Sequence, residues 1–162
     1  MAKATMQLDH DAEALLLALL DNSVELVVIG GLAVVFHGYI RLTDDVDISY
    51  ARAPANLTAI ADALAPFHPR LRGAPAGLPF VLDSRTLKSG LNFTLETDLG
   101  AIDLLGEVTG LGQFDDVIKG AIDVPFAGRT LRVIGLAALK RAKRGAGRVK
   151  DLLDLEALDK LG

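Results

Sequence analysis

Two aspartates one residue apart, Asp45 and Asp47, stand in the apolar segment "DVDISY" (45–50), directly after a third aspartate, Asp44. Alternate side chains of a strand share a face, so Asp45 and Asp47 would point the same way with Cα atoms about 6.5 Å apart. Two carboxylates so placed repel each other unless a cation compensates them. Mg²⁺ takes carboxylate oxygens and usually keeps substrate phosphates as further ligands. The spacing indicates a Mg²⁺–nucleotide site; a turn residue followed by a solvated edge carboxylate is the alternative.

A pair of glycines, Gly30 and Gly31, follows the apolar run "ELVVI" (25–29). We expect a buried strand over 25–29, a glycine turn, and a short helix over 32–37. Such a turn lets the backbone approach a phosphate closely, and the helix that follows offers N–H donors. A plain strand-to-helix turn is the alternative. The chain contains neither a G-x-x-x-x-G-K-[ST] loop nor a G-x-G-x-x-G fingerprint, so the two common nucleotide motifs are excluded.

A third carboxylate is expected if two metal ions act on the entering and leaving oxygens of an in-line displacement. Asp103 is the candidate, because it lies between Ile102 and Leu104 in "AIDLL", where a buried strand would not carry an unpaired charge. Glu96 and Asp98 are expected to face solvent or to form a turn. The three candidate metal ligands are therefore Asp45, Asp47 and Asp103.

Residues 140–150 contain six of the seventeen lysines and arginines of the chain. If this segment faces the carboxylates, its cations would bind an anionic triphosphate or an RNA acceptor. We single out Lys143 and Arg148 as ligands. A solvated helix face is the alternative. The six cations are Lys140, Arg141, Lys143, Arg144, Arg148 and Lys150.

The composition allows one domain with a sizeable core, since 51% of the 162 residues are hydrophobic. The net charge of −4 argues against nucleic-acid binding by the whole surface. The absence of cysteine excludes disulfides and thiolate metal sites. No signal peptide or membrane span is recognisable, and we expect a soluble, cytoplasmic protein.

The remaining elements predict an α/β or α+β fold with a mixed sheet. We expect a single domain over 1–162, with a core over about 22–134 and C-terminal helices over about 135–161. Residues 66–79 hold four of the six prolines and are expected to form a loop whose length suits either mobility or a role in function. The expected elements are helices over 9–21 (N-cap Asp9), 56–65 and either side of Gly145–Gly147, and hairpins turning at 98–100 and 128–129.

The segment "VVIGGLAVVFHGYIRLTDDVDISY" resembles the nucleotidyltransferase superfamily of the DNA polymerase β-like group. It is most similar to the short bacterial branch related to AbiEii-type toxins and minimal nucleotidyltransferases. That branch combines a small-residue turn, a short helix often ending in His-Gly, an Arg-x-Thr element and an Asp-x-Asp strand. The C-terminus resembles the branch's lysine helix followed by Arg-x-Lys-Asp. The matching residues are Gly30, Gly31, His37, Gly38, Arg41, Thr43, Asp45, Asp47, Asp103, Lys143, Arg148, Lys150 and Asp151.

The resemblance implies transfer of a nucleoside monophosphate from a nucleoside triphosphate to an acceptor hydroxyl. Asp45, Asp47 and Asp103 would hold two Mg²⁺ ions, for which Mn²⁺ could substitute. The nucleotide would be bound by Gly30, Gly31, Arg41, Thr43, Lys143 and Arg148. Gly31 replaces the serine of the Gly-Ser form of the turn and so removes a hydroxyl that could touch the phosphates.

The resemblance also suggests partners. The acceptor would be RNA, such as tRNA, or a protein, with a small molecule as a further alternative, and the chain would be the toxin of a toxin–antitoxin pair. The alternative is a binding module with weak or no catalysis that acts as antitoxin or as nucleotide sensor. Three converging carboxylates favour the enzyme, because a scaffold has no need of them.

Overall fold

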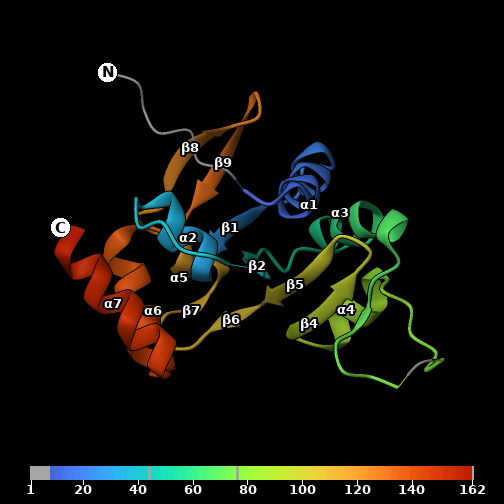
Figure 1. Cartoon of the computed structure of the whole chain (residues 1–162). Helices are drawn as coiled ribbons and strands as arrows, with labels where there is room; N and C mark the ends of the chain where they lie inside the picture. The colour runs from blue at the N-terminus through green and yellow to red at the C-terminus, as the bar shows by residue number, and fades with distance from the viewer. Residues whose placement is uncertain (1–7, 44, 76, 162) are drawn as a thin grey trace.

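A seven-stranded mixed sheet carries the predicted carboxylates (Figure 1). The computed structural model describes residues 8–43, 45–75 and 77–161, so Asp44 lies outside the described residues. The strands follow the order β3-β4-β5-β2-β1-β9-β8. The Asp-x-Asp strand β2 (Asp45–Tyr50) is central: it runs antiparallel to β1 (Leu26–Ile29) and parallel to β5 (Gly100–Leu105).

Both predicted hairpins are present at the two sides of this centre. On one side, β4 is antiparallel to β5, and the short strand β3 adds to the edge of β4. On the other side, β9 is parallel to β1 and antiparallel to β8. A separate two-stranded sheet is formed by β6 and β7. The bounds are β3 Arg70–Leu71, β4 Asn92–Thr97, β6 Glu107–Val108, β7 Gly112–Gln113, β8 Ile122–Phe126 and β9 Arg129–Val133.

Helices gather on two sides of the sheet (Figure 1). On one side α1 packs against α3, and α3 packs against α4. On the other side α2 packs on β1 and β2 and contacts α6, which packs against α7. The bounds are α1 His10–Asp21, α2 Gly30–Phe36, α3 Pro54–Leu64, α4 Ser84–Ser89, α5 Phe114–Val117, α6 Leu136–Ala146 and α7 Val149–Leu161, with a 3₁₀ turn at Ala65–Phe67.

Strand β2 has the alternation that the sequence predicts. Val46, Ile48 and Tyr50 are buried, whereas Asp45 and Asp47 on the opposite face are only half-buried. Strand β1 is buried along its whole length, as its run of β-branched and aliphatic residues indicates. One hydrophobic cluster extends from α1 through the sheet to Leu158 of α7. The apolar side chains of β2 pack into the core, and its two aspartates remain partly accessible on the opposite face.

Several local expectations are corrected. The second helix begins at Gly30, not after the glycine pair, so the turn and the helix start coincide. Asp9 stands at the N-cap of α1, but its side chain makes no capping hydrogen bond. The proline-rich segment 66–79 is not all loop, because Arg70–Leu71 pairs with β4 as a strand. That pairing is a tertiary contact, which local sequence does not encode.

Three further short elements were not expected: α4, α5 and β7. The second arm of the first predicted hairpin, "AIDLLGEV" (101–108), divides into β5 and β6. Helix α4 had a readable signal, because Asp83 caps it by accepting a hydrogen bond from the Thr86 N–H at 2.7 Å. The predicted end of α6 is confirmed: Gly147 follows Ala146 with φ +65°, a conformation that favours glycine. Among the described residues, no helix has the length and apolar character needed to cross a membrane.

Candidate active site

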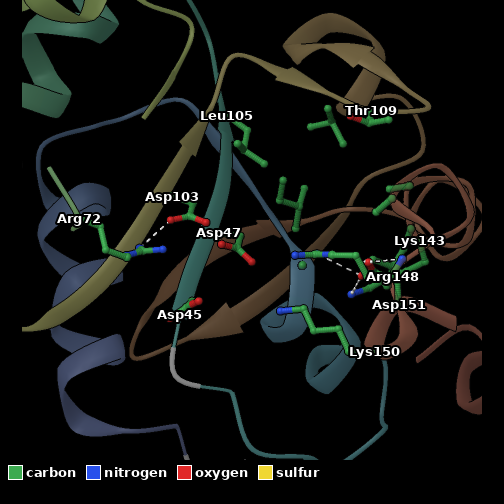
Figure 2. Close-up of a pocket in the computed structure, with 16 residues that line it drawn as sticks. Asp45, Asp47, Arg72, Asp103, Leu105, Thr109, Lys143, Arg148, Lys150 and Asp151 are labelled. Atoms are coloured by element: carbon green, nitrogen blue, oxygen red, sulfur yellow. Dashed lines mark hydrogen bonds and ion pairs between the residues drawn. The ribbon is translucent and has the colours of Figure 1, made fainter. Parts of the chain in front are cut away.

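The three predicted carboxylates lie on one face of the sheet. Strands β2 and β5 are parallel, and their register places Asp47 opposite Asp103 and Asp45 opposite Ala101. Residues that are paired across strands share a face, so Asp45, Asp47 and Asp103 point into the same space (Figure 2). Sequence separates Asp103 from Asp47 by more than fifty positions, and the strand register brings them together.

Gly30 lies directly against this cluster. A Cβ atom at Gly30 would overlap the carboxylate of Asp47, and the backbone there has φ +67°. Both facts require glycine at this position. The first residue of α2 therefore leaves open the space in which the Asp47 side chain lies.

A cavity of about 380 Å³ opens between the carboxylates and the C-terminal helices. Asp45, Asp47 and Asp103 form one wall, and Figure 2 shows Arg148 and Lys150 extending toward them from the other wall. The remaining lining includes Leu105, Val108, Thr109, Leu139 and Ala142. The cavity thus combines an acidic wall, a basic wall and an apolar part, as a site for a large anionic ligand with a metal requires.

The acidic wall is electrostatically unfavourable as it stands. Burial raises the pKa of Asp47 to about 7, with further contributions from Asp103 and Asp45, while Lys150 lowers it. A carboxyl group with so high a pKa indicates negative charge that the protein itself does not compensate.

The donor set fits a hard divalent cation such as Mg²⁺, which takes carboxylate oxygens. Within the described part of the chain, no three His, Asp or Glu side chains are already gathered at metal-ligand spacing. One of the three carboxylates, Asp103, already has a cationic partner in Arg72. Gly30 has no side chain that would displace the Asp47 carboxylate from this wall.

Lys143 lines the cavity, but its ammonium group is already bound. Its Nζ lies 3.2 Å from Asp151 Oδ1 and 2.9 Å from Asp154 Oδ2, and all three side chains are buried. This ion-pair network fastens α6 to α7. The role of Lys143 as a phosphate ligand stays a prediction, and its contacts favour a structural role.

Arg148 is placed differently. Its Nε donates a hydrogen bond of 2.6 Å to Asp151 Oδ2, yet 63% of its side chain is exposed. That hydrogen bond raises the pKa of Arg148, although burial lowers it, and the charges of Asp47 and Asp103 add to the rise. Asp151 therefore holds a cation that faces the acidic wall, which is the geometry expected of a phosphate ligand.

Three further predicted nucleotide ligands lie close together at the start of α2: Gly31, Arg41 and Thr43. A Cβ at Gly31 would come within 2.7 Å of both Arg41 Nη2 and Thr43 Oγ1. Arg41 Nε also lies 3.3 Å from Asp154 Oδ1, which ties the segment before β2 to α7. None of the three is among the residues that line the cavity. Their contact with nucleotide stays a prediction.

Two residues of the site are not singled out by the sequence. Lys150 lines the cavity; its charge is part of the basic segment, but the sequence does not show which way its side chain points. Arg72 donates to Asp103 Oδ1 at 2.7 Å. It comes from the proline-rich segment 66–79, whose composition was the available signal.

Comparison with known proteins identifies the fold. No family model and no curated protein sequence matches the chain. Among solved structures, the lincosamide antibiotic adenylyltransferase LnuA, with lincomycin bound, is similar with a TM-score of 0.62, 15% identity, and coverage of 97% of this chain and 100% of that one. The candidate nucleotidyltransferase TM1012 of Thermotoga maritima has a TM-score of 0.61, 17% identity, and coverage of 96% and 97%.

A third similar structure is the antibiotic-resistance factor ANT(2'')-Ia, with a TM-score of 0.56, 17% identity, and coverage of 94% of this chain and 83% of that one. The similarity extends over nearly the whole of the described chain in all three. At such low identity it establishes the fold, and the AbiEii-type branch stays a prediction. The chain has a nucleotidyltransferase fold, a mixed sheet flanked by helices.

Proposed function

We propose that this chain is a Mg²⁺-dependent nucleotidyltransferase that moves a nucleoside monophosphate from a nucleoside triphosphate to an acceptor hydroxyl and releases pyrophosphate. The observation that carries the proposal is the placement of Asp45, Asp47 and Asp103 on one sheet face, at the wall of a cavity whose other wall is basic. The fold shared with nucleotidyltransferases supports the same reaction.

The acidic wall would hold the cofactor. Asp45 and Asp47 would bind the ion that the triphosphate shares, and Asp103 would complete a second site beside the acceptor; Mn²⁺ could replace Mg²⁺. When bound, the two ions neutralise phosphate charge and stabilise the entering and leaving oxygens. Asp47 must lose its proton to become a ligand, since its pKa is raised to about 7. Asp103 would accept the proton of the acceptor hydroxyl.

The basic wall would bind the triphosphate. Arg148 and Lys150 line the cavity and face the carboxylates, so phosphates lying between the walls would meet cations on both sides. Asp151 fixes the guanidinium of Arg148, which lowers the entropy lost when phosphate binds. Gly30 would let the phosphates lie close to the backbone at the start of α2, and Gly31, Arg41 and Thr43 would support that turn.

The acceptor would approach from the side of β4. Thr94 pairs with Asp103 in the sheet and is exposed, so the sheet face next to the third carboxylate is open there. LnuA was solved with an antibiotic bound, which makes a small hydroxyl compound the first acceptor class to test. RNA and protein acceptors, and a role as toxin with a cognate partner, remain predictions from the sequence resemblance.

The test is transfer from α-labelled nucleoside triphosphates, ATP first, with Mg²⁺ and three acceptor pools: hydroxyl-bearing antibiotics, tRNA, and protein extract. We expect label in one pool and its loss in Asp47→Asn by at least about 10³-fold, because the metal-bound charge stabilises the transition state. Asp98→Asn is the matched control, since Asp98 is an exposed aspartate in the turn after β4. Equal transfer by Asp47→Asn and the unchanged protein would exclude the proposal.

A further inference from the structure

Arg72 makes a set of contacts that no part of the proposed reaction has yet used. Its Nη2 donates to Asp103 Oδ1 at 2.7 Å and to the carbonyl oxygen of Leu95 at 2.9 Å. Its Nε lies 3.6 Å from Glu96 Oε2. Its backbone N–H donates to the carbonyl of Thr94 at 3.0 Å and so extends the pairing of β3 with β4. The guanidinium is thus held in place independently of Asp103.

Because Arg72 binds one oxygen of Asp103, the two carboxylate oxygens have different surroundings. Figure 2 shows one oxygen bound to Arg72 and the other directed toward Asp47 and the cavity. The side chains of Arg72 and Asp103 are only 31% and 25% exposed, so water weakens this charge-assisted bond less than it would at the surface. A carboxylate fixed through one oxygen presents the other in one orientation.

We propose that Arg72 is a positioning residue: it anchors Asp103 through Oδ1 so that the second oxygen is held ready at the acceptor side of the site. This inference rests on the proposed function, in which Asp103 completes the second metal site. Outer partners that orient a metal-binding carboxylate commonly change metal affinity or activity by about 10- to 100-fold. The proline-rich segment therefore contributes to the site through Arg72.

Arg70 provides a matched control, because it begins the strand β3 that Arg72 directly follows. It lies two residues earlier, and its Nη1 contacts Asp98 Oδ1 at 3.3 Å and the carbonyl of His68 at 3.0 Å, away from the cavity. Arg70→Gln removes the same charge from the same edge without touching Asp103. Arg72→Gln and Arg70→Gln should therefore separate positioning from general charge.

The experiment titrates Mn²⁺ by electron paramagnetic resonance into protein saturated with a non-hydrolysable ATP analogue. We expect two bound ions in the unchanged protein. Arg72→Gln should keep the first and weaken the second by about 10- to 100-fold, and kcat should fall by a similar factor while the KM for nucleotide stays within about twofold. Arg70→Gln should change neither quantity.

A double-mutant cycle shows whether Arg72 acts through Asp103. Asp103→Asn should lose the second ion, and adding Arg72→Gln to it should cost no more, because the anchored group is already gone. Three results would each overturn the inference: fully additive effects of the two substitutions, unchanged affinity for the second ion in Arg72→Gln, or higher affinity for that ion. The last result would mean that Arg72 competes with the cation.

The variant Arg72→Lys and a melting curve for every variant control for misfolding. If the unchanged protein binds no ion with nucleotide, the proposed function itself fails.

Discussion

Two acidic clusters face each other across the cavity, and they differ in how their charge is balanced. Asp151 and Asp154 are almost completely buried, yet Lys143 lies between them and Arg148 and Arg41 bind their outer oxygens. Asp45, Asp47 and Asp103 are more accessible, and within the described residues the ion pairs reach only Asp103. The first cluster is balanced by cations of the chain itself. In the second, the described ion pairs leave Asp45 and Asp47 without a cationic partner.

The pKa values express the same contrast. Burial favours the neutral form of Asp151, but hydrogen bonds from Arg148 and Lys143 lower the pKa of Asp151 below its ordinary value. Burial and like charges raise the pKa of Asp47 to about 7. A folded protein that keeps an unbalanced carboxylate stores unfavourable energy, and such sites are where ligand binding is most effective.

Replacing one aspartate in each cluster should give the largest difference. Asp151→Asn leaves the buried ammonium of Lys143 with a single carboxylate and should lower the free energy of unfolding by about 3 kcal/mol. Asp47→Asn removes repulsion and should leave the metal-free protein equally stable or more stable. Chemical denaturation with a chelator present measures both. A loss of stability in Asp47→Asn as large as that in Asp151→Asn would show that the contrast is wrong.

The pH dependence of stability should differ in sign between the clusters. Because the folded pKa of Asp47 lies above its ordinary value, the native state binds the extra proton, and the metal-free protein should lose stability as pH rises from about 4 to about 7. The lowered pKa of Asp151 acts in the other direction, and its contribution should disappear as pH falls below about 4.

Thermal melting in chelator between pH 5 and 8 measures the Asp47 effect, and Asp47→Asn should flatten the curve. Adding Mg²⁺ with nucleotide should reverse the slope, since the ions bind only the ionised carboxylate and binding to the native state raises its stability. A melting temperature that is flat with pH in the unchanged protein would contradict the raised pKa.

The placement of Asp45, Asp47 and Asp103 could be predicted from sequence, and that of the network around Asp151 only in part. Asp45 and Asp47 follow from strand alternation, and Asp103 from a charge inside an apolar run. Both signals are local. The sequence shows how many charged residues surround Asp151 but not which way their side chains point, because the side of a helix that faces a cavity depends on how the helix packs. The sequence therefore favours Lys143 as a ligand, although two carboxylates enclose its ammonium group in the structure.

Arg72 shows the same limit more clearly. Its contact with Asp103 depends on the pairing of a two-residue strand with β4, which is decided by tertiary structure. The sequence indicated only that the proline-rich segment was long enough to have a role. The sheet and its two hairpins were predictable because their residues alternate in polarity, whereas α4, α5 and β7 are too short for a periodic signal.

The smallest expected effect concerns Arg148, which binds Asp151 and extends toward the carboxylates of the sheet. If its guanidinium binds phosphate as well as Asp151, Arg148→Ala should weaken nucleotide affinity by about 10-fold, because one charge-assisted hydrogen bond is worth roughly 1.5 kcal/mol. Arg144→Ala is the control, since Arg144 is exposed on α6 and does not line the cavity. Titration of the protein with nucleotide at fixed salt measures the affinity of both variants. If Arg148 is a specific phosphate ligand, the affinity should fall in Arg148→Ala alone. Equal small losses in both would mean only diffuse attraction, and Arg148 would then belong to the structural network alone.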